Sequence, residues 1–217
     1  MHNSINNLTS IEKQIKSSFN QLATPQIIAV SKTFSVNEIK PLIDHGHIHF
    51  GENKVQESVE KWTDLKITSK DIKLHMIGKL QTNKVKYVIP LFDYIHSLDN
   101  IKLAEKISHE QIKRNKRLKI FIQVNVGNEK QKSGIDPKDL KEFYNKCISD
   151  LKLDVIGLMC IPPQEGDVKK YFKNMFDFKN SLGLKELSMG MSSDYIDAIE
   201  HGSTFVRIGS KIFGNRN

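Results

Sequence analysis

The sequence predicts a single (β/α)8 TIM barrel with an extra N-terminal helix. Short apolar segments of strand length alternate with longer segments of helical periodicity along all 217 residues, and this alternation is typical of α/β proteins with a parallel sheet. Eight strand-like segments occur, which is the number that closes such a barrel. A doubly wound open sheet is the alternative architecture. No linker, repeat or low-complexity segment marks a second domain, so we expect residues 1–217 to form one domain.

The expected strands are short and largely apolar, and the first shows the pattern most clearly. Its residues Ile27, Ile28, Ala29 and Val30 form a continuous apolar run, as in strands that are buried on both faces of a sheet. In chain order, we expect strands at Gln26–Ser31, His47–Gly51, Leu74–Ile77, Tyr94–Ser97, Ile120–Val126, Val155–Met159, Leu187–Gly190 and Phe205–Gly209.

Longer amphipathic segments separate these strands, and several begin with helix-start signals. Ser35 and Glu38 have the spacing of a capping box. Asp136 is expected to be an N-cap, with Pro137 at the first position of the helix. We expect helices at Leu8–Leu22, Val36–His45, Lys54–Leu65, Ile101–Arg114, Pro137–Ser149, Val168–Leu182 and Tyr195–Glu200. The first of them precedes every strand, and we expect it to close the bottom of the barrel.

Composition argues against several classes of protein. The formal net charge is +8, but the lysines are scattered among Glu and Asp, so we expect a solvated basic surface and no nucleic-acid partner. Cys147 and Cys160 are the only cysteines, so we expect reduced thiols and no metal site. No apolar run has membrane-spanning length, and residues 1–22 lack the pattern of a signal peptide. We therefore expect a cytoplasmic protein with no membrane partner.

The first expected strand ends on Lys32, at the end of a parallel sheet where ligands bind. A lysine held in such a place is partly desolvated, which lowers its pKa and lets the neutral amine form a Schiff base with an aldehyde. The alternative is an ordinary solvated lysine that follows a strand.

Two glycine- and serine-rich segments follow the last two expected strands. Arg207-Ile208-Gly209-Ser210 ends the eighth strand, and Ser188-Met189-Gly190-Met191-Ser192-Ser193 ends the seventh. Such segments expose backbone N–H groups and hydroxyls that suit a phosphate, the ligand that this barrel most often holds here. The alternative is two glycine-containing turns. Because strand one neighbours strand eight in a closed barrel, an aldehyde site would lie beside a phosphate site, and pyridoxal phosphate carries both groups.

Several blocks of the sequence resemble the pyridoxal phosphate homeostasis protein family, in order across nearly the whole chain. The blocks are Ala29-Val30-Ser31-Lys32-Thr33, His49-Phe50-Gly51-Glu52-Asn53 with Val55-Gln56-Glu57, His75-Met76-Ile77-Gly78 with Leu80-Gln81 and Asn83-Lys84, Lys132-Ser133-Gly134, Gly157-Leu158-Met159, Leu187-Ser188-Met189-Gly190-Met191-Ser192, and Gly202-Ser203-Thr204 with Val206-Arg207-Ile208-Gly209 and Ile212-Phe213-Gly214. The resemblance implies a one-domain barrel, related to the N-terminal domain of bacterial alanine racemase, that binds pyridoxal 5'-phosphate and has no established turnover.

The resemblance also implies roles for individual residues. Lys32 would hold the cofactor as a Schiff base, and Ser192, Gly209 and Ser210 would bind its phosphate. Arg207 would face the pyridine nitrogen. A guanidinium stays protonated, so it would leave that nitrogen unprotonated and the cofactor a poor electron sink.

Four further residues are less directly tied to the cofactor. Two of them have two interpretations each, one is expected in the core, and one departs from the family pattern. Asn53 either contacts the cofactor ring or caps the following helix, and Met159 either packs beneath the ring or belongs to the core. We expect His75 to be a hydrogen-bonded core histidine. Lys79 stands where the family pattern has a proline, and we expect this difference to leave the cofactor site unaffected.

Two functions from different classes follow. The first is a carrier that stores or protects pyridoxal phosphate, or delivers it to apo-enzymes, without catalysis and as a monomer. The second is a racemase-like enzyme, which would need a second proton-transfer group opposite the lysine; in the racemases a tyrosine from another domain supplies it. None of the tyrosines lies in an obvious replacement block; they are Tyr87, Tyr94, Tyr144, Tyr171 and Tyr195. We favour the carrier.

Overall fold

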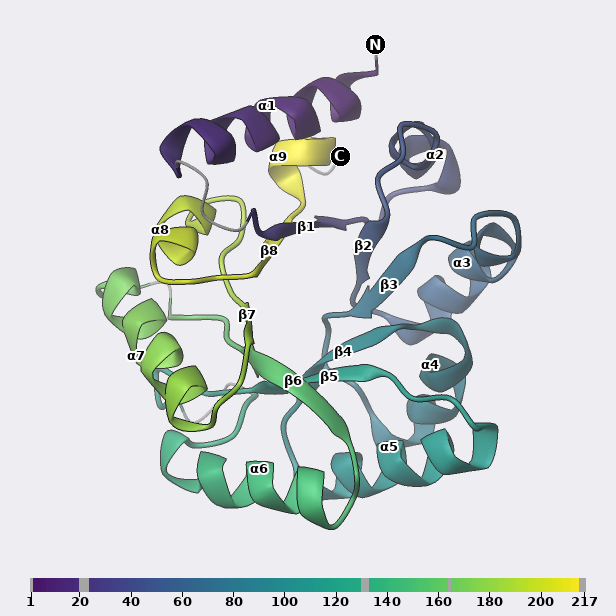
Figure 1. Cartoon of the computed structure of the whole chain (residues 1–217). Coiled ribbons are helices and arrows are strands. Elements are labelled where there is room, and N and C mark those ends of the chain that lie inside the picture. The colour runs from purple at the N-terminus through teal and green to yellow at the C-terminus, as the bar shows by residue number, and fades with distance from the viewer. Residues whose placement is uncertain (1, 20–23, 130–132, 164, 215–217) are drawn as a thin grey trace.

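The computed structural model is a closed parallel barrel, and it describes residues 2–19, 24–129, 133–163 and 165–214 (Figure 1). The strands follow one another around the barrel in chain order from β1 to β8. Closure is made by β1 and β8, which pair in parallel with Ile27 opposite Val206 and Ala29 opposite Ile208. The predicted barrel is therefore confirmed, and the open doubly wound sheet is not formed.

The strands occur where the apolar runs predict them, with ends that differ by at most three residues. Their bounds are β1 Gln26–Val30, β2 His49–Glu52, β3 Lys73–Met76, β4 Tyr94–Leu98, β5 Lys119–Gln123, β6 Asp154–Met159, β7 Glu186–Ser188 and β8 Phe205–Ile208. The expected fifth strand is too long, since Val124 leaves the sheet to form an isolated bridge with Ile135. The seventh is also shorter than expected, because the chain turns at Gly190, whose φ is +90°.

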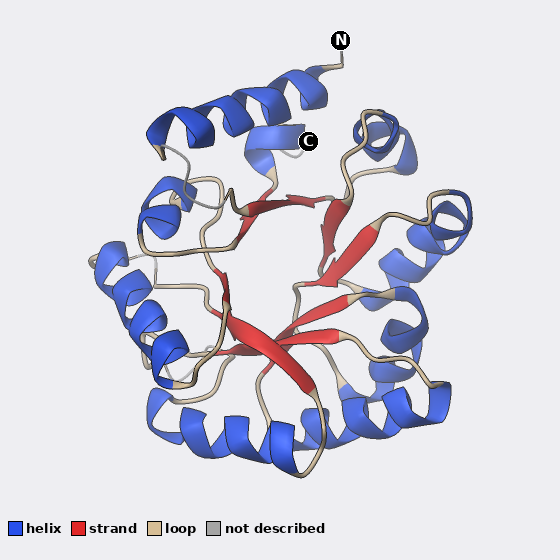
Figure 2. Cartoon of the chain, viewed as in Figure 1, coloured by secondary structure: helices blue, strands red, loops and turns tan. Residues whose placement is uncertain are grey.

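The helices form a ring outside the strands (Figure 2). Their bounds are α1 Asn3–Ser18, α2 Val36–Asp44, α3 Val55–Thr68, η1 Thr82–Lys84, α4 Val85–Leu91, α5 Ile101–Arg114, η2 Pro137–Asp139, α6 Leu140–Ser149, α7 Val168–Ser181, α8 Tyr195–Glu200 and α9 Ser210–Phe213. The sequence analysis did not predict α4, which is short and contains Pro90, or α9, which has four residues. None of the described helices is long and apolar enough to cross a membrane.

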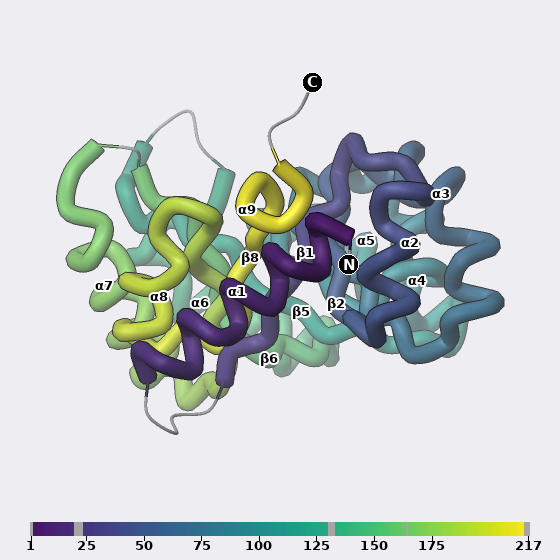
Figure 3. The backbone as a smooth tube through the Cα atoms, turned by 90° about the horizontal axis from the view of Figure 1, so that it is seen from above, coloured from purple at the N-terminus to yellow at the C-terminus, as the bar shows by residue number. Residues whose placement is uncertain are grey.

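Helix α1 does not close the bottom of the barrel, contrary to expectation. It lies on the outer surface beside α9, as Figures 1 and 3 both show. Asn7 donates a hydrogen bond to the Ile212 carbonyl, and the Tyr195 hydroxyl donates one to Gln14. The physical reason is that α9 is too short to cover the outer face of β8 and β1, so the apolar side of α1 covers it. The expected end of this helix at Leu22 lies outside the described residues.

The inside of the barrel contains a row of hydrogen-bonded polar side chains. His49 Nδ1 lies 2.9 Å from His75 Nε2, His75 Nδ1 lies 2.9 Å from His96 Nε2, and His96 Nδ1 lies 2.8 Å from Ser188 Oγ. We call His49, His75, His96 and Ser188 the histidine column. His75 is fully buried and hydrogen-bonded, as predicted for a core histidine.

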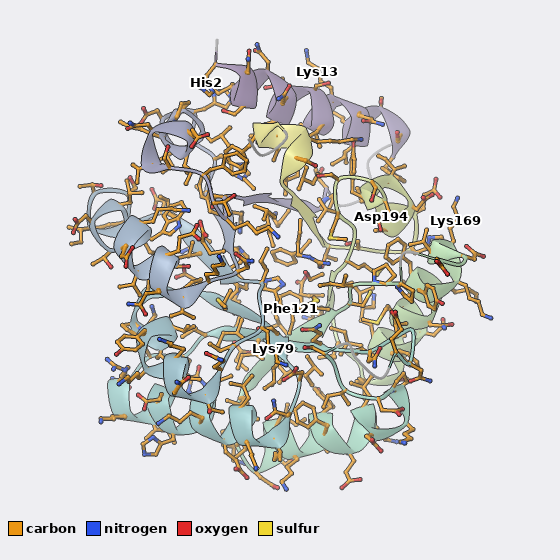
Figure 4. The ribbon with its side chains drawn as sticks, turned by 180° about the vertical axis from the view of Figure 1, so that it is seen from behind. His2, Lys13, Lys79, Phe121, Lys169 and Asp194 are labelled. Carbon is orange, nitrogen blue, oxygen red and sulfur yellow. The ribbon has the colours of Figure 1, made fainter. Side chains whose placement is uncertain are left out.

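Aromatic rings hold the column in place. His75 stacks on Tyr94 with ring centroids 4.2 Å apart, and His96 stacks on Phe121 at 4.3 Å. Figure 4, viewed from behind, labels Phe121 near the centre of the barrel. Branched aliphatic side chains commonly fill such barrels. Imidazoles are more costly to bury, and their mutual hydrogen bonds offset that cost.

We predict that this interior makes the protein sensitive to mild acid. Burial lowers the pKa of His49 and of neighbouring His47 to about 4, and lowers the pKa of His75 and His96 well below the ordinary value. Between pH 6.5 and 4 the unfolded chain therefore binds more protons than the folded chain, and the free energy of unfolding falls as pH falls. At pH 5 the loss should be about 2 kcal/mol for each of His47 and His49, and His75 and His96 should increase it.

Urea unfolding at pH 7 and pH 5 measures this loss. His96→Phe should reduce the pH dependence, whereas replacement of the exposed His109 by glutamine should leave it unchanged. Equal stability of the wild-type protein at both pH values would contradict the prediction.

Candidate functional site

A cavity of about 930 Å³ opens at the carboxyl ends of the strands. Six of the seven predicted site residues lie on its wall, namely Lys32, Asn53, Ser192, Arg207, Gly209 and Ser210. The other described lining residues are Val30, Phe34, Ile77, Gly78, Lys79, Gln123, Ser133, Ile161, Met191, Ser193 and Gly214. The cavity therefore combines residues from the loops after most of the strands, as is usual for ligand sites in this barrel.

Arg207 provides a buried positive charge at the inner wall of the cavity. Its side chain lies on β8 and the residue is 4% exposed. One terminal nitrogen donates to Ser188 Oγ at 2.8 Å, and the other donates to the Cys160 carbonyl at 2.8 Å. Burial lowers the pKa of Arg207 from its ordinary value, yet a guanidinium remains charged in a protein. No carboxylate pairs with it in the described part of the chain, so its charge is available to a ligand.

Ser192, Ser193 and Ser210 present hydrogen-bond donors on one side of the cavity. The backbone N–H groups of these three residues donate no hydrogen bond to the described part of the chain. Nearby, Asp194 Oδ1 accepts the Met191 N–H at 2.6 Å and fixes the turn that leads into α8. Free N–H groups beside serine hydroxyls are the donor set that binds a phosphate.

The close packing of Gly190 explains why a glycine is present in this turn. Its φ is +90°, and a Cβ atom there would lie 2.6 Å from the Ala198 Cβ. Any larger residue would push the serine-rich segment away from α8 and move its donors.

The cavity wall is positively charged. Its described lining includes Lys32, Lys79 and Arg207 and no aspartate or glutamate. An anionic ligand is therefore favoured, because a wall with basic side chains and no described carboxylate attracts negative charge. Lys79, which was expected to be irrelevant to the cofactor site, lies on the wall of the same cavity, and Figure 4 labels it.

Met159 is not part of the cavity wall. It is 1% exposed and packs inside the barrel with Ile28, Tyr94, Phe121 and Phe205. It is a core residue of the barrel interior, and its proposed contact with the cofactor ring stays a prediction. Asn53 does lie on the wall, and its Oδ1 is buried without a hydrogen-bond partner among the described residues. It does not cap α3, whose N-cap is Lys54.

Several wall residues were not predicted from the sequence, and some of them lie at or shortly after the end of a strand. Gln123 ends β5 and donates a hydrogen bond to the Ser133 carbonyl at 3.3 Å, while Ile161 follows β6. The rule that ligands bind at the carboxyl ends of strands identifies Gln123 and Ile161 once the strand ends are known. Ser133 belongs to the block Lys132-Ser133-Gly134, of which Lys132 lies outside the described residues.

Comparison with known proteins places the chain among close relatives. The family model "Alanine racemase, N-terminal domain" matches residues 6–217. A "Pyridoxal phosphate homeostasis protein" of Aquifex aeolicus is 40% identical over 200 residues, which cover 88% of this chain and 87% of that protein. The protein of the same name from Escherichia coli strain K12 is 37% identical over 202 residues, with coverage of 88% and 86%.

Solved structures agree with these relatives. PipY of Synechococcus elongatus, determined without PLP, is 33% identical, has a TM-score of 0.89 and matches over 98% of this chain and 100% of its own. PipY with PLP bound is 32% identical with a TM-score of 0.86, and coverage is 97% and 100%. An alanine racemase of Clostridium difficile is 17% identical with a TM-score of 0.73 over 99% of this chain and 57% of its own, and it shares the fold.

We predict that Lys79 contributes to the attraction of anions into the cavity. Lys79→Ala should weaken the binding of inorganic phosphate at low ionic strength about three- to fivefold, the equivalent of roughly 1 kcal/mol for a partly exposed charge. Isothermal titration calorimetry measures the dissociation constant. Lys70→Ala makes the same charge change at an exposed residue that does not line the cavity and should bind phosphate as the wild type does. Equal affinity in the two variants would contradict a role for Lys79.

Proposed function

The chain belongs to the family of pyridoxal phosphate homeostasis proteins, and on that premise we propose that it binds pyridoxal 5'-phosphate and keeps the supply of this cofactor in balance. The observation that carries the proposal is the convergence, in one cation-lined cavity, of the Lys32 amine with the N–H groups of Ser192 and Ser210. The amine suits an aldehyde and the N–H groups suit a phosphate, so the donor set fits both ends of the cofactor.

Each group of the site has a proposed task. Lys32 attaches the cofactor covalently through its Nζ, while Ser192, Gly209 and Ser210 bind the phosphate. Arg207 donates a hydrogen bond to the pyridine nitrogen and retains its own proton. When bound, pyridoxal phosphate supplies a reactive aldehyde and an electron-withdrawing ring. Because Arg207 keeps the ring nitrogen unprotonated, the site holds the cofactor without making it a strong electron sink.

We further propose that the protein is a carrier without catalytic turnover. A racemase needs a second proton-transfer group opposite the lysine. Of the tyrosines that were considered for this task, none lies on the described wall of the cavity. Tyr94 is inside the barrel and Tyr195 donates its hydroxyl proton to Gln14 on the outer surface. The absence of a tyrosine from the described wall supports storage and delivery.

We propose that the recipients are apo-enzymes that depend on pyridoxal phosphate. We also propose that the chain acts as a monomer of one domain. In support, the loops of one closed barrel line the described cavity and supply every proposed binding group.

The test of the proposed function is attachment of the cofactor to Lys32. The wild-type protein, incubated with pyridoxal phosphate and reduced with borohydride, should carry a pyridoxyl group on the peptide that contains Lys32. Lys32→Ala should lack this adduct and keep the circular dichroism of the wild type, because Lys32 lies on the wall of the cavity and not in the core. Lys70→Ala, at an exposed lysine that does not line the cavity, serves as the matched control and should retain the adduct.

An adduct on another lysine of the wild-type protein would refute the proposed attachment site. A panel of amino acids, followed by chiral chromatography, tests the carrier against the racemase. Inversion that disappears in Lys32→Ala would refute the absence of turnover.

A further inference from the structure

The turn that carries Lys32 has a strained backbone. Thr33, the next residue, has a φ of +71°. This left-handed conformation is rare for residues with a side chain and most unfavourable for β-branched residues such as threonine. Such strain persists only where the surrounding structure holds it, and it gathers at functional sites. The structure must therefore contain contacts that compel this turn.

Glu57 on α3 provides the first contact. Its Oε1 accepts a hydrogen bond from the Thr33 backbone N–H at 2.7 Å. Burial acts to raise the pKa of Glu57, but the Thr33 N–H and the Lys61 ammonium outweigh it and hold the pKa below its ordinary value. The residue is therefore an ionised acceptor at neutral pH, and a hydrogen bond to a charged acceptor is stronger than one to a neutral one.

Lys61 on the same helix provides the second contact, on the other side of Lys32. Its Nζ donates to the Ser31 carbonyl at 3.0 Å and also contacts Glu57 Oε1 at 3.0 Å and Glu52 Oε1 at 3.1 Å. The Lys61 side chain is 8% exposed and that of Glu52 is fully buried. Glu57 and Lys61 are four residues apart, so both project from one face of α3 toward the turn.

Glu52 links this pair to β1 and to the core. Its Oε1 also accepts the Ser31 hydroxyl at 2.7 Å and the Trp62 indole N–H at 3.0 Å. Ser31 N–H donates to the Gly51 carbonyl at 3.0 Å. Ser31, immediately before Lys32, is thus attached to β2 and α3, and Thr33, immediately after it, is attached to α3.

We propose that Glu57 and Lys61 are positioning residues that hold the strained turn around Lys32 and direct the Lys32 amine toward the cofactor aldehyde. The inference rests on the proposed function, since it assigns a task to residues behind the attachment lysine. A lysine side chain has four rotatable carbons, so its amine is only as well placed as the backbone that carries it. Glu57 fixes the backbone after Lys32, and Lys61 fixes the backbone before it.

The experiment compares three substitutions on α3. Glu57→Ala removes the acceptor of the Thr33 N–H, Glu57→Gln retains an acceptor of the same shape, and Glu60→Ala makes the same charge change at an exposed residue of the same helix. Two quantities are measured for each protein. The first is the concentration of pyridoxal phosphate that gives half of the reducible adduct at Lys32, and the second is hydrogen exchange of the Thr33 amide without cofactor.

Glu57→Ala should raise the half-saturating concentration about tenfold or more, the effect expected when a charged hydrogen bond is lost. It should also abolish protection of the Thr33 amide. The half-saturating concentration of Glu57→Gln should remain within about threefold of the wild-type value, and that of Glu60→Ala should equal the wild-type value. Thr33→Gly, which accepts the positive φ without strain, should reduce the effect of Glu57→Ala when the two are combined.

Two results would overturn the inference. One is wild-type adduct formation in Glu57→Ala, and the other is a loss in Glu57→Gln as large as in Glu57→Ala. Failure of the proposed function gives a different result, because the wild-type protein would then form no adduct at Lys32. In that case a Thr33 amide that is protected in the wild type and exposed in Glu57→Ala would still support the held turn.

Discussion

The parallel pairing of β1 with β8 is the interaction on which the site depends. It places Ile28 opposite Arg207 and Ala29 opposite Ile208, so the segments that follow the two strands leave the barrel side by side. Lys32 lies near the start of the chain and Ser210 near its end, yet they share one cavity wall. A doubly wound open sheet would place the first strand inside the sheet and the last strand at an edge, so the two would not pair. The same closure explains α1, which covers the outer face that the short α9 leaves exposed.

The buried guanidinium of Arg207 determines how the barrel interior is ordered. Arginine has no hydrogen-bond acceptor, so Ser188 Oγ accepts a hydrogen bond from Arg207. The Ser188 hydroxyl therefore donates its proton to His96 Nδ1, which is the other partner of Ser188 Oγ among the described residues. His96 then donates from Nε2 to His75, and His75 donates from Nε2 to His49. This assignment directs every dipole of the histidine column away from the positive charge. The buried charge and the buried imidazoles thus stabilise each other's orientation, although each alone is costly to bury.

The sequence was sufficient for the fold and for the place of the site, but not for everything near it. The apolar run at 27–30 and the glycines near the ends of β7 and β8 act locally, so their effects could be predicted from residue type. The position of α1 depended on the length of α9, which no local pattern revealed. The role of Met159 was ambiguous from the sequence, because the last residue of a strand can lie beside the ligand site or in the core. Which of the two it faces depends on the pleat of the strand, which the sequence does not reveal. Nothing in the sequence indicated that Glu57 and Lys61 lie near Lys32. Their hydrogen bonds to Thr33 and Ser31 join residues that are 24 and 30 positions apart in the chain.

The distribution of carboxylates gives the site its chemical character. Glu52 and Glu57 lie behind the wall, where they neutralise Lys61 and hold the turn of Lys32. Neither lies on the described wall of the cavity, whose basic residues are Lys32, Lys79 and Arg207. A carboxylate on that wall would pair with Lys32 and stabilise its ammonium form, and an ammonium cannot attack an aldehyde. The negative charges instead lie one layer back, where they hold the turn that carries Lys32, and the wall keeps the basic character that favours an anionic ligand.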